Sequence, residues 1–430
     1  MRRPRSRHHF KGMAAMLLSL PLALSAATLS SNRGSLEAGA PPAARHPLSE
    51  TLSVGGRLEA EYRQESDYDL DRQRADTVEL LTLFHPSLAL SWRPAPQWSV
   101  YGNLEYVDTG IFADEAGRES HPAELRLDKL FIDHRRDGLL LRLGRQRLKD
   151  RREWMLDDTL DGLRLSWRHP DFTLTAAWLR ERAFTEDLLN GDDVKAVDHL
   201  WLHLNAPRSK TRDQAVYLMV QNDQEKDEQA VWFALHNQGE WEDIDYWAEA
   251  AAVGVDKRGR RGGGFGFDIG ASYRLMKRPR IYVYGGYAFG SGDPDDVDLG
   301  FRQTDLQDNA AKFGGVTRIA YYGELLDPEL SNLTIATLGI GIRPVRNASI
   351  DLLWHGYLQH YALDELRESD LVVEPDGRNH DIGQAVDLVV GYRIRGRLRA
   401  EAIFARFYPG SAFADQDPAS LLKLQLRYNL

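Results

Sequence analysis

Hydrophobic and polar residues alternate one by one along most of the chain. In residues 264–275, GFGFDIGASYRL, every second position from Phe265 to Leu275 is apolar or aromatic, and the positions between them are glycine or polar. Residues 382–395 and 420–430 repeat the pattern, and no helical period of similar length occurs. A period of two residues is typical of β-strands with one apolar face. The sequence therefore predicts an all-β fold built as one long antiparallel meander.

The alternation predicts about eighteen strands after residue 50, and bacterial outer-membrane barrels have even strand numbers. The predicted ranges are 53–63, 77–92, 97–107, 124–134, 138–147, 161–168, 172–181, 197–206, 214–222, 229–237, 241–253, 263–275, 280–289, 332–342, 345–356, 381–395, 397–408 and 420–430.

Connections of two lengths separate the predicted strands. The short ones include residues 93–97, 135–137 and 169–171, and the long ones include 108–123, 148–160, 290–331 and 357–380. Short turns at one end and long loops at the other are typical of outer-membrane β-barrels, in which the turns are periplasmic and the loops extracellular. We therefore expect residues 148–160, with Arg151 and Arg152, to form an extracellular loop.

Aromatic residues flank several of the short turns. Trp92 and Trp98 flank one turn, Trp167 and Phe172 flank another, and Trp241 follows a third. Aromatic rings favour the boundary between membrane and water. A soluble β-sandwich or propeller is the alternative, but such a fold needs no apolar face of this width opposite an equally polar one. We therefore predict a transmembrane antiparallel β-barrel with short periplasmic turns and long extracellular loops.

The first residues have the composition of a secretory signal peptide. Five basic residues and no acidic residue precede the apolar run 13–24, and small residues follow it. We expect a signal peptide over residues 1–27, a flexible segment over 28–50 and an outer-membrane barrel over 51–430. Loss of the five basic residues changes the formal net charge from −10 to about −15. The chain has no cysteine, which excludes disulfides and thiol chemistry.

With the apolar face toward lipid, residues of the opposite parity face the barrel interior. The basic residues at such positions are Arg57, Arg63, Arg142, Arg164, Arg393, Arg399, Lys423 and Arg427. The carboxylates at such positions are Glu59, Glu61, Asp268, Asp387 and Glu401. Barrel closure pairs the first and last strands, so we expect their basic residues to become neighbours. Two interpretations stay open: a guanidinium-lined wall that attracts anions, or arginines that pair with these carboxylates.

Three further patterns are weak candidates for metal binding or catalysis. His199 and His203 share a strand face but lack a third ligand, and the acidic run 292–298 lacks the spacing of a calcium loop. Residues 354–360, WHGYLQH, contain histidines without the serine that a hydrolase at the barrel rim requires. We expect no enzymatic activity, no metal, no cofactor and no nucleic-acid partner.

Three stretches of the sequence carry a resemblance to a known family. Residues 142–165, RLGRQRLKDRREWMLDDTLDGLRL, contain a Gly-Arg-Gln element and an Asp-Gly-Leu-Arg element. Residues 301–343 contain the elements Tyr-Gly-Glu and Glu-Leu-Ser-Asn-Leu, and residues 349–360 read SIDLLWHGYLQH. These stretches resemble the alginate-export family of outer-membrane barrels, and the resemblance covers essentially all of the chain after residue 50.

The resemblance implies a monomeric eighteen-stranded barrel. Family members include an exporter that passes an anionic polysaccharide through an arginine-rich constriction, so Arg142, Arg145 and Arg164, in or beside the matching motif, become pore-lining candidates. That exporter has a long periplasmic turn that plugs its pore, whereas the turn near Gly396 is too short for a plug. The expected partners are outer-membrane lipid, an anionic polysaccharide such as alginate, and a periplasmic secretion scaffold. A porin for small anions and a structural anchor with a filled lumen are the alternatives in the same fold.

Overall fold

The computed structural model describes residues 44–430 apart from 74–76, 114–122, 192–193, 207–211 and 395–396. The predicted signal peptide and residues 28–43 of the predicted flexible segment lie outside the described residues. What is described belongs to one compact unit, Gly39–Leu430. Across the described ranges, no helix is long and apolar enough to cross a membrane.

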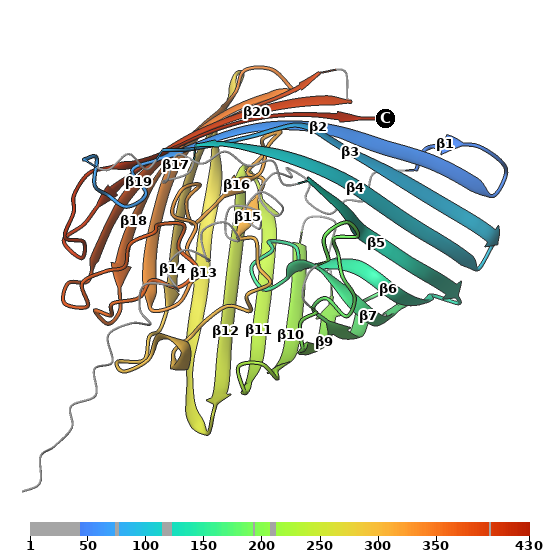
Figure 1. Ribbon diagram of the computed structural model, residues 1–430, viewed down its shortest axis with the longest axis horizontal. Coiled ribbons are helices and arrows are strands. Elements are labelled where there is room, and N and C mark those ends of the chain that lie inside the picture. The colour runs from blue at the N-terminus through green and yellow to red at the C-terminus, as the bar shows by residue number, and fades with distance from the viewer. Residues whose placement is uncertain (1–43, 74–76, 114–122, 192–193, 207–211, 395–396) are drawn as a thin grey trace, which may run out of the picture. The chain divides into compact units, whose positions relative to one another are not determined.

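Eighteen antiparallel strands form one closed sheet in the described part of the chain (Figure 1). They are β2 (Leu52–Ser66), β3 (Val78–Ala95), β4 (Trp98–Ala113), β5 (Ala123–Arg136), β6 (Leu139–Lys149), β7 (Asp157–Arg168), β8 (Thr173–Arg180), β9 (Val197–Asn205), β10 (Arg212–Asp223), β11 (Glu228–Trp241), β12 (Ile244–Lys257), β13 (Arg260–Lys277), β14 (Arg280–Gly290), β17 (Leu333–Arg343), β18 (Ala348–Gln359), β19 (Asp381–Ile394), β20 (Leu398–Pro409) and β21 (Ala419–Asn429). Each strand pairs with its neighbours in the chain, and β21 pairs with β2 to close the ring. A two-residue strand, β1 (His46–Pro47), adds to β2. The predicted barrel and its strand number are confirmed.

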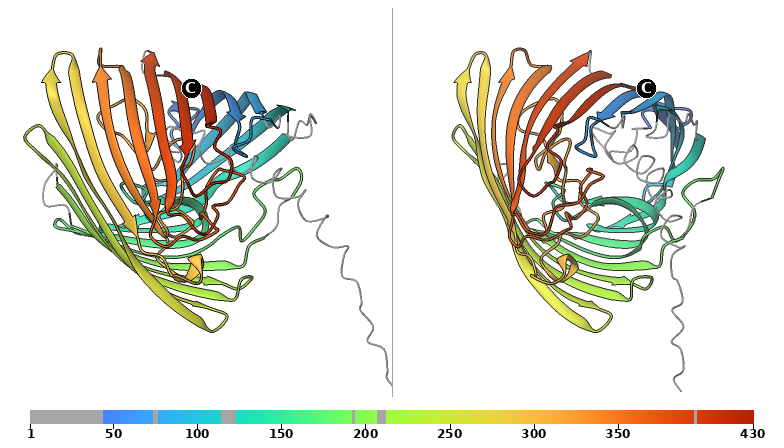
Figure 2. Two further views of the ribbon diagram at one scale, coloured as in Figure 1. Left: turned by 90° about the vertical axis from the view of Figure 1, so that its left-hand side faces the viewer. Right: turned by 60° about the vertical axis from the view of Figure 1, so that its left-hand side comes forward.

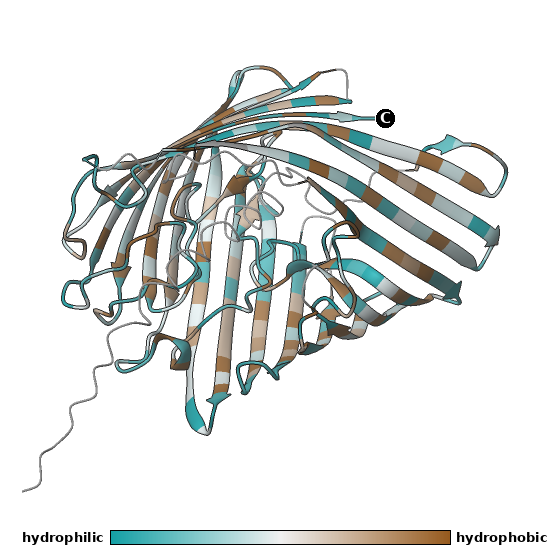
Figure 3. Ribbon diagram, viewed as in Figure 1, coloured by the Kyte–Doolittle hydropathy of each residue, from teal (hydrophilic) through white to brown (hydrophobic). Residues whose placement is uncertain are grey.

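The strands present an apolar face outward and a polar face inward. On β21, Leu424 and Leu426 are 43% and 47% exposed, whereas Lys423 and Gln425 are each 4% exposed. Figure 3 shows the pattern as alternating brown and teal bands along the strands. Because the closed sheet pairs the backbone N–H and C=O groups internally, its apolar outer face can lie in a bilayer without unpaired polar groups.

The connections divide the barrel into a turn end and a loop end. At the turn end, short connections follow β3, β5, β7, β11, β13, β17 and β19. Gly396 is itself outside the described residues, but β19 ends at Ile394 and β20 begins at Leu398, so this connection is short. At the loop end most connections are longer, as predicted. Residues 224–227 and 258–259 are short turns at the loop end, so a strict alternation of short and long connections is wrong at these two positions.

The longest connection, residues 291–332, packs inside the barrel. It contains the 3-10 helix η1 (Val297–Leu299) and the short strands β15 (Ala310–Ala311) and β16 (Ile319–Ala320), and Figure 2 shows it within the ring of strands. The Phe313 ring lies 5.4 Å from that of Trp247 and 5.3 Å from that of Tyr284, between ring centroids. Trp247 and Tyr284 belong to the inner faces of β12 and β14.

Apolar side chains explain why this connection turns inward. Phe301, Leu325, Leu326 and Leu330 are all 0% exposed. Burial of a side chain of this size stabilises by roughly 1.5–3 kcal/mol relative to exposure to water. The expectation that residues 290–331 form an extracellular loop is therefore wrong for most of their length: the segment leaves the wall at the loop end and then fills part of the interior.

Candidate functional site

The hairpin of β6 and β7 carries the basic residues from Arg145 to Arg152 into the barrel interior. Arg152 lies in the connection between β6 and β7, and its Nη2 is 3.1 Å from Asp268 Oδ2 on β13. The Trp154 indole N–H donates to the Tyr322 hydroxyl oxygen at 2.8 Å. These contacts overturn the prediction that residues 148–160 form an extracellular loop.

Apolar burial and cation–π contacts hold the hairpin tip in this place. Trp154, Met155 and Leu156 are between 1% and 3% exposed. The Arg152 guanidinium carbon lies 4.5 Å from the Trp247 ring and 4.4 Å from the ring of Tyr321. Such a contact is worth about 2 kcal/mol or more when it is desolvated.

Each of the six basic residues between 142 and 152 has a carboxylate partner. The pairs are Arg142 with Asp133, Arg145 with Asp161, Arg147 with Asp157, Lys149 with Glu153, Arg151 with Asp213, and Arg152 with Asp268. The local concentration of positive charge is thereby compensated inside the protein. An acidic chain can gather arginines here because they bind its own carboxylates.

Arg142 and Arg164 lie side by side on the inner face near the turn end. They occupy directly opposed positions on β6 and β7. Arg142 holds Asp133 through two hydrogen bonds of 2.6 and 2.9 Å, and its guanidinium lies 3.6 Å from the Phe131 ring centre. Among the described residues no carboxylate forms an ion pair with Arg164. This pair is thus a site of net positive charge on the wall.

The seam between the first and last strands carries mixed charge. Glu59 lies opposite Arg427, and the Arg427 Nε donates to the Glu59 carboxylate at 2.9 Å. Arg57 donates to Glu105 at 3.0 Å. Lys423 lies 3.9 Å from Glu61. Basic and acidic side chains therefore alternate along this part of the wall.

The other predicted interior residues are also positioned by partners or burial. Arg63 pairs with Glu65 and lies 3.6 Å from Asp370, and Arg399 and Glu401 are 8% and 6% exposed on β20. Arg393, half-buried, is opposed in register to Arg399 at the turn end of β19.

Asp387 lies at the contact between the wall and residues 291–332, which we call the inward loop. It is 0% exposed, accepts the Glu324 backbone N–H at 2.9 Å and lies 3.3 Å from His355 Nε2. Its carboxylate therefore binds the inward loop, and the sequence alone does not reveal this role.

Burial raises the pKa of the Glu324 carboxyl to about 8, and the charge of Asp387 adds to the rise. The folded protein therefore keeps a proton on Glu324 that the unfolded chain, with the ordinary value of 4.5, releases. Between these two pH values stability falls as pH rises, and it levels off above the upper one. We expect the Glu324→Gln variant to lose less stability than the wild type between pH 5 and pH 8. The temperature at which the folded, heat-modifiable gel band disappears measures this, and equal losses would contradict the assignment.

A second polar cluster joins the hairpin to the inward loop. Arg318 pairs with Glu153 and lies 3.1 Å from Asp308, and Arg147 pairs with Asp157. The carboxylates of Glu153, Asp157 and Asp308 lie within 4.8 Å of one another, as the ligands of a metal ion would. The two arginines already supply the compensating positive charge, so the cluster is an ion-pair network.

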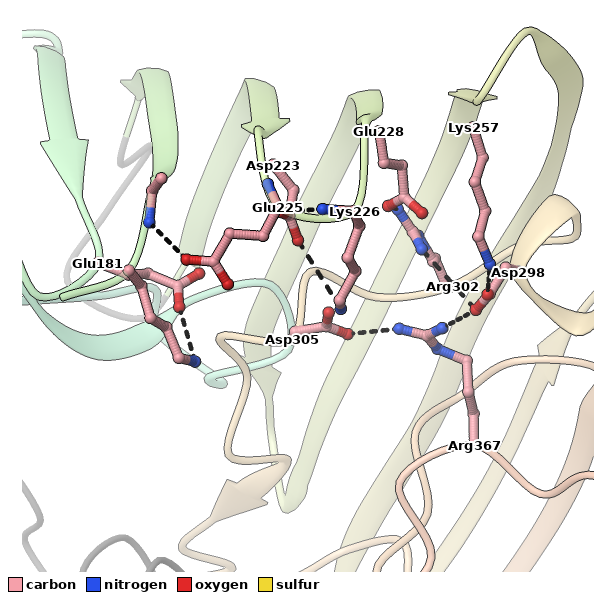
Figure 4. A network of polar contacts seen from close by, with 12 residues as sticks. Glu181, Asp223, Glu225, Lys226, Glu228, Lys257, Asp298, Arg302, Asp305 and Arg367 are labelled. Carbon is pink, nitrogen blue, oxygen red and sulfur yellow. Dashed lines mark hydrogen bonds and ion pairs between the residues drawn. The ribbon is translucent and has the colours of Figure 1, made fainter. Parts of the chain in front are cut away.

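Figure 4 shows a third network, at the loop end. Arg367, between β18 and β19, binds Asp305 at 2.7 Å and also pairs with Asp298 and Glu329 of the inward loop. Arg302 of the same loop pairs with Glu228 on β11. The network fixes two long connections to each other and to the wall.

The weaker sequence candidates have ordinary structural roles. His199 Nε2 lies 3.1 Å from Glu181, whereas the His203 ring stacks 4.7 Å from that of Tyr217. Within the acidic run 292–298, Asp296 pairs with Arg260 at 2.5 Å. In the described chain neither pattern forms a cluster of three metal-ligating side chains.

Comparison with known proteins decides the family. A family model described as alginate export matches residues 50–425. The chain belongs to the alginate export family. It is 26% identical over 332 residues to the alginate production protein AlgE of Pseudomonas aeruginosa. This match covers 66% of this chain and 67% of that protein. A protein of the same description from Azotobacter vinelandii is 28% identical over 177 residues, 36% of each chain.

Solved structures support the fold. OccK5 (OpdH) of Pseudomonas aeruginosa has a TM-score of 0.58 at 10% identity, over 90% of this chain and 99% of that one. OccAB4 of Acinetobacter baumannii has a TM-score of 0.58 at 9% identity, over 89% and 98%. Family and fold together make this alginate-export-family protein an outer-membrane transport barrel and not an enzyme.

Proposed function

We propose that this barrel passes an acidic exopolysaccharide, such as alginate or a related polyuronate, across the outer membrane. The observation that carries the proposal is the match of the alginate export family over residues 50–425. The relatives named alginate production protein support the same class of substrate. A periplasmic secretion scaffold would deliver the polymer, and the barrel would act as a monomer.

The charges of the interior suit a polyanion that must enter and also leave. A guanidinium group donates two parallel hydrogen bonds to a carboxylate, and that carboxylate can belong to the protein or to a uronate. Arg142 already shares its donors with Asp133, so a passing uronate competes for them and is held weakly. Passage requires binding that is favourable at several sites but tight at none. Arg164 supplies the uncompensated charge that attracts the chain.

Charge reversal at Arg142 and Arg164 tests this proposal. In planar bilayers at low salt we expect the wild type to prefer anions and the double variant Arg142→Glu, Arg164→Glu to shift its reversal potential toward cations. Each substitution changes the local charge by two units within a low-dielectric wall. The shift should shrink at ~1 M salt, where charges are screened beyond about 3 Å.

The matched control reverses two arginines outside the interior. Arg258 and Arg261 lie at the short turn between β12 and β13, and the Arg261 side chain is 85% exposed. Changing both to glutamate should shift the reversal potential much less. An equal shift for the two double variants would contradict a role of Arg142 and Arg164 in the passage. Block of the current by an oligouronate but not by a neutral oligosaccharide of equal length separates a polymer conduit from a porin for small anions.

A further inference from the structure

The hairpin of β6 and β7 separates from its neighbours halfway along the wall. Pairing between β5 and β6 stops at Leu130 and Arg145, and pairing between β7 and β8 stops at Asp161 and Arg180. The two strands of the hairpin stay paired with each other up to Lys149 and Asp157. We call residues 145–161 the inward hairpin.

Two opposed glycines form the point where the hairpin leaves the wall. Gly144 and Gly162 face each other in register and have φ angles of 123° and 156°. A Cβ atom would lie 2.2 Å from the Leu130 carbonyl oxygen at the first glycine and 2.1 Å from the Trp178 carbonyl oxygen at the second. Both positions therefore require glycine, on conformational and on steric grounds.

The residues next to the glycines fasten this bend. Arg145 holds Asp161 through two hydrogen bonds of 2.9 Å, and both side chains are buried. The Gln146 side-chain amide donates to the Gly162 carbonyl oxygen at 3.1 Å. The Gly-Arg-Gln and Asp-Gly elements of the sequence are thus the parts of one bend.

Another segment occupies the place in the wall that the hairpin leaves. Residues 181–190, between β8 and β9, bond to the free edge of β5: the Leu127 N–H donates to the Glu186 carbonyl at 3.0 Å, and the Leu188 N–H donates to the Leu125 carbonyl at 2.8 Å. Leu188 is 48% exposed, and other apolar side chains in this segment are exposed to a similar degree. The wall stays closed and apolar outside while the hairpin lies within.

The inward hairpin reaches across the interior. Its tip touches β12 and β13 through Arg152, and β12 is five strand positions from β7 around the ring. Neighbouring strands in a sheet are about 4.8 Å apart, so β12 is too far from β7 along the wall for this contact. The hairpin therefore crosses the interior of the barrel. Figure 2 shows the hairpin curving into the ring beside the inward loop.

We propose that the inward hairpin sets the aperture of the passage, and that Gly144 and Gly162 are the positioning residues that hold it there. The inference rests on the proposed function in one respect: it requires that the barrel is a channel. It concerns the width of the path and does not depend on the identity of the polymer. The conductance of small ions therefore tests it separately from any polymer experiment.

Thiol modification tests the position of the tip in the native fold. The chain has no cysteine, so Arg151→Cys introduces a single thiol at a side chain that is 56% exposed. We expect a bulky thiol reagent to reduce single-channel KCl conductance by roughly half or more, because the attached group narrows the passage beside the hairpin tip. Arg261→Cys, modified to the same extent by mass, should leave the conductance unchanged. Full modification of Arg151→Cys without a conductance change would overturn the proposal.

Removal of the tip is the complementary test. Replacing residues 150–156 with Asn-Gly joins Lys149 and Asp157, which are already paired, by a two-residue hairpin turn. We expect the conductance to rise roughly twofold or more because the crossing segment is gone. An unchanged conductance in assembled channels would contradict the role of the hairpin.

A glycine substitution tests the bend itself. Gly162→Val should raise the conductance of the channels that assemble, because the hairpin cannot stay bent. The control is Gly254→Val, on the outer face of β12, where nothing lies within 4 Å of an added Cβ. Assembly of Gly162→Val with wild-type conductance would overturn the positioning role.

Discussion

Replacing Leu426 with arginine is expected to abolish most assembly of the barrel. Leu426 is 47% exposed on the outer face of β21, in the part of the strand that faces lipid. An arginine near the bilayer midplane costs about 2–4 kcal/mol on the lipid face of such barrels. The measurement is the fraction of protein in the membrane that runs as a folded band before boiling and as an unfolded band after it.

Gln425→Arg is the matched control one position away. Gln425 points inward and donates to Glu59 and Glu61, each at 2.8 Å. An arginine there meets two carboxylates, so we expect assembly close to that of the wild type. Similar levels of folded barrel for both variants would show that the inner and outer faces are assigned wrongly.

Arg145→Leu is expected to lower the stability of the barrel by about 3–5 kcal/mol, because it leaves a buried carboxylate without its partner. Arg145 and Asp161 are 3% and 2% exposed, so water cannot replace the lost donors. The temperature at which the folded gel band is lost reports the effect.

A double variant separates the ion pair from simple loss of packing. Arg145→Leu with Asp161→Asn removes the charge but keeps an acceptor for the Ala183 N–H, which Asp161 binds at 2.8 Å. We expect it to recover most of the lost stability. Arg135→Ala is the control, since Arg135 is 57% exposed and its partner Asp133 keeps Arg142. Failure of the double variant to recover, with Arg135→Ala harmless, would mean that the arginine acts through its volume.

The strands could be predicted because their signal is local. Alternation on β13 and β21 follows from one face in lipid and the other inside, and each strand shows it without reference to the rest of the chain. The neighbours in the closed ring also follow, since a meander pairs each strand with the next. Closure also predicts that basic residues of the first and last strands become neighbours, as Arg63 and Lys423 do. The position of Glu59 opposite Arg427 depends on the register, which closure alone does not fix.

The contents of the barrel could not be predicted in the same way. Arg152 meets Asp268 more than a hundred positions away, and no local pattern selects that partner from the other carboxylates. Two signals were nevertheless present in the sequence. Phe301 and Leu330 are large apolar residues in a segment predicted to lie in water, and Gly144 and Gly162 interrupt otherwise continuous strands. The first signal indicates a buried loop, and the second indicates a bend.

The pairing of the arginines changes how the passage is understood. A count of basic residues in 142–152 predicts a strongly positive wall, but their carboxylate partners leave net positive charge mainly at Arg142 and Arg164. A polyanion would therefore meet a path of mixed charge that holds it weakly at several points. In our proposal the path is narrowed from the loop end, where the inward hairpin and residues 291–332 enter the interior.

Release from proteoliposomes tests the central claim most directly. Vesicles containing the purified barrel would be loaded with an oligouronate and a neutral oligoglucan of the same chain length, and the loss of each would be followed over time. We predict that the oligouronate escapes faster than the neutral chain, and that Arg142→Glu with Arg164→Glu removes this preference. Equal escape rates for the two polymers from wild-type vesicles, or retention of both while small ions pass, would contradict an outer-membrane conduit for an acidic polysaccharide.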